Sequence, residues 1–421
     1  MTTPHHDIGY ERRTLVLLGL GFGLVGFDRW LMAPMFPYMM KDLGLDYSQL
    51  GSLIGVLGVA WGLWSIVMGP VSDRIGRKRI LIATMVVFSI LSSLSGFATG
   101  FASLMLLRAA MGVAEGAFTP ASLAANSEAS RASRRGLNQG LQLSMIPLVG
   151  LGFAPIAATQ LLRIVPSWHW VFMISAVPGL IVSALIWRLL TEHGRGGASA
   201  RGSDAAKMPW TQLLRTRNVL VATAAILCAM GGIFVMGAMV PTYLVAELHL
   251  DTRSMGFVAS AIGFGGFAGS FALPGISDYL GRRPTALFGF AAATLLLYCF
   301  ARTGPNPALL FALLFGLSMF SIGLLSLLSG PVATEAAPVG LIASTIGFVS
   351  GVGETFGGGV APVIAGFIAQ HYGLARTLDF AFYSLIAGAL VVVLLVETAP
   401  RRCVAAGRAG DVAVAPSAND L

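Results

Sequence analysis

Two stretches of the sequence repeat each other and decide how the rest of the chain is interpreted. The first is GPVSDRIGRKR (residues 69–79), and the second is PGISDYLGRR (residues 274–283). Each follows a long apolar segment and combines an Asp, a Gly and a basic cluster. Such a stretch suits a tight turn between helices, because its Asp can meet a helix N-terminus and its Arg residues a helix C-terminus. Two copies at matching positions predict a chain built from two repeated halves.

The composition around these turns is too apolar for a water-soluble protein. Of 421 residues, 56% are hydrophobic and only 11% are charged, whereas soluble proteins carry roughly 25% charged residues. Most of the surface must therefore meet lipid. The net charge of +8 does not indicate nucleic-acid binding, because the basic residues are scattered in short clusters between apolar runs. The three cysteines are far apart and indicate no disulfide framework.

The apolar segments predict twelve membrane-spanning helices, because a hydrocarbon core of about 30 Å needs about 20 helical residues. The expected fold class is therefore all-α and integral to the membrane, with two six-helix bundles related by pseudo-two-fold symmetry. The spans are expected at residues 14–40, 49–71, 80–98, 101–127, 137–162, 168–190, 217–246, 254–277, 284–302, 307–332, 340–370 and 374–397.

The polar segments divide the chain further. The bundles are expected at residues 14–191 and 217–398, joined by a cytoplasmic central loop at 192–216 that is rich in Gly, Ser, Ala and Arg. Cytoplasmic tails are expected at 1–13 and 399–421. With the termini inside, 20 of the 27 Lys and Arg residues fall on the cytoplasmic side and five on the other. This asymmetry follows the positive-inside rule and predicts a multi-pass protein of the bacterial inner membrane with both termini in the cytoplasm.

Ionisable residues inside the spans are few, and each is informative. The first span carries Asp28 and Arg29, the fourth carries Arg108 and Glu115, and the eleventh carries Glu354. A charge at mid-membrane costs about 2.5–3.5 kcal/mol and needs a partner, a wet cavity or a function. Residues 108 and 115 are seven positions apart, about two helical turns, so they share one face.

Two interpretations of these charges stay open. In the first, the two acids and two bases pair with each other and brace the amino-terminal half. In the second, they line a cavity with a fixed cation for an anionic substrate and a carboxylate that takes up a proton. A substrate carboxylate that competes for an Arg would favour proton binding at Glu115, which is the linkage of a symporter. Buried ion pairs are weak stability devices, and this favours the second interpretation.

The repeated turns resemble the signature Gly-x-x-x-Asp-Arg-x-Gly-Arg-Lys/Arg of the major facilitator superfamily. The resemblance covers about residues 14–397. The second copy departs from the signature at Pro274 and Tyr279. The resemblance implies alternating access of two six-helix bundles and a gate on the cytoplasmic side. The gate residues on this comparison are Gly69, Asp73, Arg74, Gly76, Arg77, Asp278, Gly281 and Arg282.

A narrower resemblance is to the anion:cation symporter family, which includes bacterial sugar-acid importers, sialin and vesicular glutamate transporters. It rests on FDR (residues 27–29), on RAAMGVAEG (residues 108–116), and on matching residues entering spans 6 and 7, namely Trp168, Trp170, Phe172, Pro241, Tyr243 and Leu244. It implies that Arg29 and Arg108 attract the substrate carboxylate. It also implies that Asp28 and Glu115 are the protonation sites.

The sequence departs from that family at positions that bear on the substrate. Trp61 and Ser65 stand where sugar-acid importers tend to have Tyr and Gln, and Phe356 replaces a frequent Asn. These departures disfavour a polyhydroxylated sugar acid and favour a less polar monocarboxylate. Trp61 and Tyr243 are candidate substrate-lining residues, although aromatic residues are more often packing or interfacial anchors. Glu354 is either a second proton site or the cap of a Gly-rich turn.

The expected function is proton-coupled import of a small organic anion, and an exporter of drugs or metabolites by proton exchange is the alternative. No enzyme activity is expected, because no nucleophile–base pair and no soluble domain is evident. The pattern G-x-G-x-x-G at residues 21–26 lies inside an apolar span, so it predicts close helix packing rather than a nucleotide cofactor. No cofactor, metal site or nucleic-acid partner is expected. The partners are the anion, protons and the lipid bilayer, and the chain is expected to be a monomer.

Overall fold

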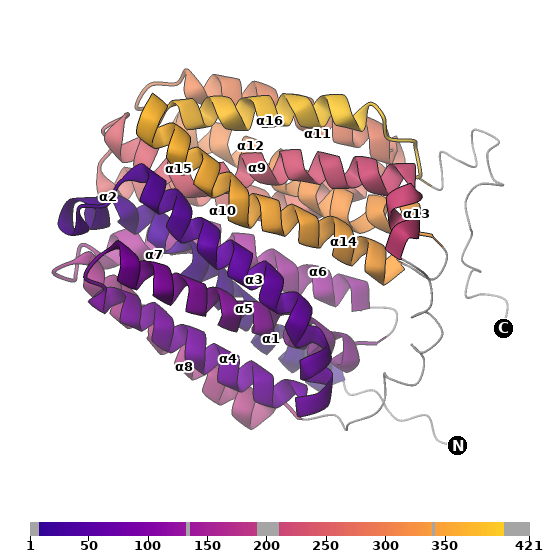
Figure 1. The fold of residues 1–421 in the computed structure, drawn as a ribbon, viewed down its shortest axis with the longest axis horizontal. Helices are drawn as coiled ribbons and strands as arrows, with labels where there is room; N and C mark the ends of the chain where they lie inside the picture. The colour runs from indigo at the N-terminus through magenta and orange to yellow at the C-terminus, as the bar shows by residue number, and fades with distance from the viewer. Residues whose placement is uncertain (1–7, 132–134, 192–209, 339–341, 400–421) are drawn as a thin grey trace.

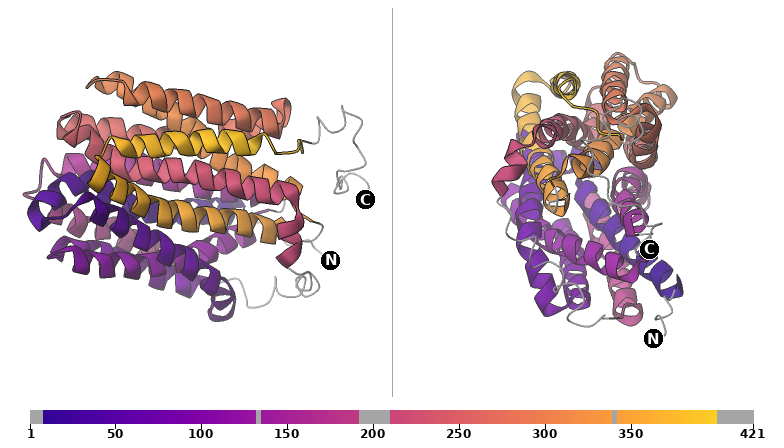
Figure 2. Two further views of the ribbon diagram at one scale, coloured as in Figure 1. Left: turned by 45° about the horizontal axis from the view of Figure 1, so that its top comes forward. Right: turned by 90° about the vertical axis from the view of Figure 1, so that its right-hand side faces the viewer.

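The computed structural model describes residues 8–131, 135–191, 210–338 and 342–399, and within these ranges every regular element is helical. Figures 1 and 2 show two bundles of long helices lying against each other, one from each half of the chain. Ten of the described segments are long and apolar enough to cross a bilayer. Helices α3 and α16 occupy the remaining two predicted spans. The expectation of an all-α fold in two bundles is therefore confirmed.

The first bundle follows the predicted spans with two internal breaks. Span 1 divides at Leu31 into two helices, and span 5 contains a wide π-helical turn, η3, between two α-helices. Such turns arise where Gly and Pro disturb the regular backbone hydrogen bonds of the α-helix, and they are frequent at functional sites. The elements are α1 (Ile8–Trp30), α2 (Met32–Leu43), α3 (Tyr47–Ile75), α4 (Arg77–Leu94), α5 (Phe101–Ala129), α6 (Arg135–Met145), η3 (Ile146–Phe153), α7 (Ala154–Leu161) and α8 (Trp168–Leu189).

The second bundle repeats this plan. Span 7 has the predicted bounds, and span 11 contains the π-helical turn η7 within its Gly-rich centre. The elements are α9 (Arg217–Ala246), α10 (Thr252–Leu280), α11 (Arg282–Ala301), α12 (Pro307–Leu327), η6 (Leu328–Val332), α13 (Ala333–Ala336), α14 (Ile342–Glu354), η7 (Thr355–Val360), α15 (Ala361–Tyr372) and α16 (Arg376–Val392).

The two ends of the molecule can be distinguished by which helix termini lie at each of them. The Tyr10 hydroxyl donates to the carbonyl oxygen of Thr191 (3.2 Å), so α1 begins where α8 ends. The Asn218 amide donates to the carbonyl oxygen of Val396 (3.1 Å), so α9 begins beside the segment that follows α16. Figure 1 places the start of α9 and helix α13 at the same end, which we call the terminal end. The other end, with α2 and α7, is called the opposite end.

Close backbone contacts join the two bundles from the middle of the molecule to the opposite end. A Cβ atom on Gly51 or Gly58 of α3 would overlap the backbone of Pro362 or Gly358 in the other bundle. The Trp30 and Phe234 rings also meet between the bundles, with centroids 5.5 Å apart. By contrast, Gly347 in the terminal half of α14 is exposed and has no described heavy atom of another segment within 4 Å. The bundles therefore pack most tightly away from the terminal end.

A second close contact allows the tight packing between the bundles to be tested. A Cβ atom on Gly263 of α10 would overlap the backbone around Gly152 in η3, and a backbone cannot rotate away as a side chain can. We expect Gly263→Val to separate the bundles at the opposite end. Spin labels on the exposed rim positions Arg163 and Arg253 should then give longer distances by pulsed electron paramagnetic resonance. Gly275→Val on the same helix, where no described atom lies within 4 Å, is the control and should leave the distances unchanged. An unchanged distance between the two labels in Gly263→Val would contradict tight packing of the bundles at the opposite end.

Candidate functional site

Arg29 lies at the end of α1 and forms an ion pair across the interface between the two bundles. Its Nη1 atom is 2.8 Å from Oε1 of Glu354, the last residue of α14, and their side chains are 6% and 14% exposed. The sequence left the role of Glu354 open between a proton site and a turn cap. The structure places it as the partner of Arg29. The pairing runs between the halves, whereas the first interpretation of the charges required pairs within the amino-terminal half.

Aromatic rings surround the Arg29 guanidinium. Its Cζ atom is 4.9 Å from the ring centroid of Phe234, 5.7 Å from that of Trp61 and 6.0 Å from that of Trp30. Rings at these distances attract a cation through their π-faces. Trp61 was a candidate from the sequence. Phe234 was not, because one Phe among 25 carries no signal of its own until the fold shows which face of α9 it occupies.

Several donors in this cluster have no hydrogen-bond partner among the described residues. They are the Nε and Nη2 atoms of Arg29 and the indole Nε1 of Trp61, and all three atoms are buried. Buried polar atoms are almost always paired in native proteins, so each unpaired donor needs an explanation. Two donors on the guanidinium and one on a neighbouring ring could donate hydrogen bonds to the oxygens of an anion.

Arg108 is buried at 1% exposure, and it braces α1. Its Nη1 atom donates to the carbonyl oxygens of Asp28 (3.3 Å) and Arg29 (3.2 Å). These carbonyls lie in the last turn of α1, where helix geometry leaves them without intrahelical partners and where a cation is favoured. The Nε and Nη2 atoms of Arg108 remain unpaired among the described residues. Arg108 therefore holds the break between α1 and α2 and keeps two donors free.

Asp28 points into the first bundle, away from the bundle interface. Its Oδ1 atom accepts a hydrogen bond from the Ser92 hydroxyl of α4 (2.8 Å), and Ser92 also pairs with Ser175 of α8 (2.8 Å). Asp28 itself is 2% exposed. The sequence did not identify the two serines. A Ser within an apolar span is common, and its hydroxyl usually donates to a backbone carbonyl of the preceding turn.

Glu115 of α5 is completely buried, and neither carboxylate oxygen has a hydrogen-bond partner among the described residues. The next residue, Gly116, lies against the backbone of Trp61. An ionised carboxylate is costly to bury without a partner, so either a proton or a cation must reach Glu115.

A buried polar stripe continues from Glu115 along α5 toward the terminal end. Its members recur at helical spacing, and residues 115 to 130 span about 22 Å of helix. The Asn126 amide donates to the Gln142 amide oxygen (2.7 Å), and the Asn138 amide donates to the Glu11 carboxylate (2.7 Å). Such a stripe offers hydrogen-bonding groups between Glu115 and the terminal end. The buried members are Thr119, Ser122 and Asn126 of α5, Ser130 directly after it, and Asn138 and Gln142 of the adjoining helix α6.

Tyr243 lies apart from the charged cluster. It packs inside the second bundle, where its ring centroid is 6.3 Å from that of Phe300. It is nine residues beyond Phe234 in α9, which is about 13 Å along the helix. The structure therefore brings Arg29, Trp61 and Glu354 together and leaves Tyr243 toward the opposite end.

The repeated turns adopt the same conformation in both halves. Gly76 and Gly281 have φ values of 104° and 101°, a region that favours glycine because it has no Cβ atom. The following residue, Arg77 or Arg282, forms an ion pair at 2.9 Å with Glu128 or at 2.7 Å with Glu335, respectively. The expected internal repeat is therefore present in three dimensions.

The repeated turns at residues 69–79 and 274–283 differ from the prediction in their length. Helix α3 continues to Ile75 and α10 to Leu280, so the glycine turn is shorter than the quoted stretches. Arg282 also pairs with Asp278 (2.6 Å), one helical turn before it. The Glu397 carboxylate accepts from the backbone N–H of Arg282 (2.7 Å), which places an anion at the start of α11. Gly69 falls within α3, and the side chains of Asp73 and Arg74 lie outside the described part of the structure.

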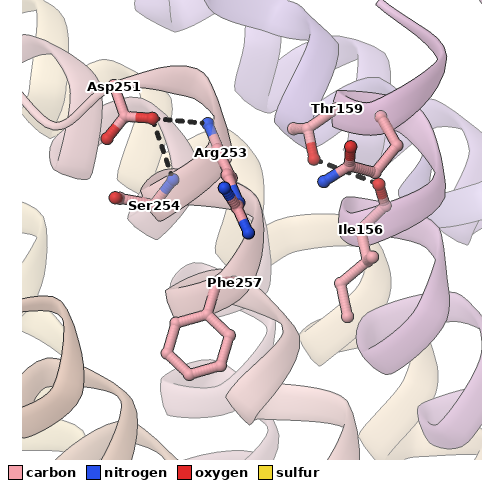
Figure 3. A pocket seen from close by; sticks show the side chains of 7 residues that line it. Ile156, Thr159, Asp251, Arg253, Ser254 and Phe257 are labelled. Carbon is pink, nitrogen blue, oxygen red and sulfur yellow. Dashed lines mark hydrogen bonds between the residues drawn. The ribbon is translucent and has the colours of Figure 1, made fainter. Parts of the chain in front are cut away.

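Two cavities are described, and both lie at the opposite end, away from the charged cluster. The larger has a volume of about 630 Å³ between α7 and α10, and the smaller, about 320 Å³, is lined by Tyr38, Arg163 and Trp168. Figure 3 shows Arg253 between the start of α10 and the residues of α7. Hydrogen bonds from Ser254 lower the pKa of Asp251, which caps α10. The Arg29 and Glu354 side chains are 6% and 14% exposed, so in this conformation their cluster is largely shielded from solvent.

Two six-helix repeats with buried charges at their interface define a polytopic membrane transporter. The family model of the Major Facilitator Superfamily matches residues 18–355 and 223–416. The chain belongs to this superfamily, and it is a transporter rather than an enzyme.

Similar proteins are found among curated relatives and solved structures. A probable 4-methylmuconolactone transporter of Cupriavidus pinatubonensis is 27% identical over 92% of this chain and 91% of its own length. A D-galactonate transporter of Escherichia coli is 26% identical over 92% of this chain and 96% of its own. A bacterial homologue of the human lysosomal transporter Spinster, solved in an inward-facing and unoccupied conformation, aligns with a TM-score of 0.73 and 16% identity over 97% of this chain and 100% of its own.

Proposed function

We propose that the chain imports a small organic anion, a carboxylate, together with protons across the bacterial inner membrane. Arg29 binds the carboxylate at the interface between the bundles. The observation that carries this proposal is a buried cation held against a carboxylate of the other bundle, with two donors, Nε and Nη2, that have no hydrogen-bond partner in the described part of the chain. The named transporters of D-galactonate and 4-methylmuconolactone among the relatives support an organic anion as the class of substrate.

The ion pair gives the site a means of responding to substrate. Glu354 presents to Arg29 the same chemical group as the substrate. A bound carboxylate competes with Glu354 for the guanidinium, and it thereby weakens a contact that joins the two bundles. Movement of the bundles is the basis of alternating access, so substrate binding and movement become linked.

Glu115 carries the proton in this proposal, and Asp28 is a second candidate. The Glu115 carboxylate is buried and has no hydrogen-bond partner among the described residues, so burial favours its neutral form, and the polar stripe on α5 leads from it toward the terminal end. Arg108 lies about two turns before Glu115 on the same face of α5, and its Nε and Nη2 atoms have no hydrogen-bond partner among the residues that the structure describes. A substrate carboxylate that draws an Arg donor favours the protonated form of Glu115, so proton and anion bind cooperatively.

The orientation of the cycle follows from the placement of basic residues. If the positive-inside rule holds, the terminal end is cytoplasmic and the tightly packed opposite end faces outward. The structure then corresponds to a state closed toward the outside. The Arg77 and Arg282 ion pairs lie at the cytoplasmic ends of both halves, where they act as the gate.

Uptake into proteoliposomes tests the proposal. We expect an inward proton gradient to drive accumulation of a labelled carboxylate, measured with gluconate and with 4-hydroxybenzoate as separate probes. Protein-free liposomes measure passive entry of the protonated acids. Accumulation above that background with either probe supports import with protons. Outward pumping of neutral or cationic compounds, with no uptake of either carboxylate, would overturn the proposal in favour of an exporter.

A further inference from the structure

We propose that the anion carries its carboxylate on a flat, sparsely hydroxylated body, such as an aromatic or conjugated ring. This inference rests on the proposed function and narrows the class of its substrate. It follows from what surrounds the Arg29 guanidinium and from the number of hydrogen-bonding groups that remain unpaired there.

Apart from the Glu354 carboxylate, the surroundings of the cation are flat and apolar. The structure places against it the rings of Trp30, Trp61 and Phe234, with centroids 4.9–6.0 Å from Cζ. A Cβ atom on Gly358 would lie 2.5 Å from Nη2, so a residue without a side chain is needed where η7 packs against the guanidinium edge. A ring attached to the carboxylate can lie against these faces, and aromatic pairs of this kind contribute about 0.5–1.5 kcal/mol beyond burial.

The unpaired donors match one carboxylate. Arg29 offers Nε and Nη2, and Trp61 offers its indole N–H, all buried and without partners among the described residues. Two carboxylate oxygens can accept three hydrogen bonds from these donors. We therefore assign these donors to the carboxylate of the substrate.

Two hydroxyls near this cluster already donate their hydrogens within their own helices, so neither can donate to a substrate hydroxyl without losing that bond. Ser65 donates to the carbonyl oxygen of Gly62 (2.9 Å), and Thr355 donates to that of Gly351 (2.9 Å), each within its own helix. Thr355 lies close to α3, 3.2 Å from where a Cβ on Gly62 would be. A polyhydroxylated chain would have to bury hydroxyls against aromatic faces, and each unpaired hydroxyl costs about 1–3 kcal/mol. Two such hydroxyls would weaken binding about 30-fold or more.

The preference can be measured by calorimetric titration of the purified full chain with three monocarboxylates. Benzoate presents a flat ring, cyclohexanecarboxylate a puckered ring without π-faces, and gluconate a chain of hydroxyls. We expect benzoate to bind most tightly, cyclohexanecarboxylate about 3- to 10-fold more weakly, and gluconate about 30-fold or more weakly than benzoate. Benzamide, which has the ring but no charge, should not bind measurably.

Variants connect the preference to the named side chains. Phe234→Leu should lower the affinity for benzoate about 3- to 10-fold and change that for cyclohexanecarboxylate less. Phe288→Leu, at a position 62% exposed on α11, is the matched control and should change neither. Gluconate binding as tightly as benzoate would overturn this inference and leave the proposed function standing. If no carboxylate binds, the proposed function itself fails.

Discussion

Replacing Arg29 with Ala is expected to weaken binding of 4-hydroxybenzoate by about 100-fold. Removing one partner of a buried, hydrogen-bonded charge pair costs about 2–5 kcal/mol, which corresponds to about 30-fold to several thousand-fold in affinity. Arg29 fits that description, because it is 6% exposed and its unpaired donors point to an anion. Calorimetric titration of the purified variant measures the change directly.

The variant also leaves Glu354 without its partner, and this effect must be separated from loss of binding. An unpaired buried carboxylate destabilises the contact between the bundles. The double variant Arg29→Ala with Glu354→Gln removes both charges, so it should recover thermal stability without recovering affinity. Glu354→Gln alone keeps the cation and removes its internal competitor, so we expect tighter binding of the carboxylate. Arg29→Ala with wild-type affinity would show that the anion binds elsewhere.

Arg29→Lys is a further discriminating variant. Lys keeps the positive charge but lacks the planar guanidinium, whose donors can bind both oxygens of a carboxylate at once. If charge alone attracted the anion, the Lys variant would bind normally. We expect it to bind almost as weakly as Arg29→Ala, because the site depends on donors placed between aromatic faces.

Much of the fold could be predicted from hydropathy, because the bilayer forces every spanning segment to be a helix of similar length. Span 7 was predicted with the bounds that α9 has, and the two repeated turns share their φ angles and ion pairs. The breaks inside spans 1, 5 and 11 were not predicted. Their positions depend on how Gly and Pro residues meet the neighbouring helices, which the hydropathy of one segment does not record.

The members of the site were mostly predicted, but their pairing was not. An ionisable residue in an apolar span is identifiable because it is costly there, so Arg29 and Glu354 were both identified. Which charges meet depends on the rotation of each helix about its axis and on the packing of the two bundles. The sequence therefore could not predict the ion pair between α1 and α14 or the approach of Phe234. Tyr243 shows the opposite case. It was predicted to line the substrate path, but it lies about 13 Å along α9 from Phe234, away from the charged cluster.

Glu115→Gln is expected to abolish proton-driven accumulation while binding and exchange persist. A gradient of two pH units supplies about 2.7 kcal/mol per proton, which permits about 100-fold accumulation for one proton per anion. Gln has nearly the shape of a protonated Glu but cannot release a proton. The variant is therefore held in the state that binds substrate, and the gradient no longer has a group through which to act.

Two assays on the same proteoliposomes separate coupling from binding. With the membrane potential clamped at zero, wild-type protein should accumulate labelled 4-hydroxybenzoate above the passive level of protein-free liposomes, and Glu115→Gln should not. With equal pH and unlabelled 4-hydroxybenzoate inside, both proteins should exchange the label. Asp379→Asn, which removes an exposed carboxylate on α16 that pairs with Arg376, is the comparison for general effects of removing an acid.

The outcome also decides between the two carboxylates of the first bundle. Asp28 accepts a hydrogen bond from Ser92, so its oxygen has a partner in the state described, whereas both oxygens of Glu115 have none among the described residues. A group that must alternate between charged and neutral forms needs a partner in only part of the cycle. If Glu115→Gln still concentrates the label to the wild-type level, the proton travels on another carboxylate, and Asp28→Asn becomes the variant that should abolish coupling.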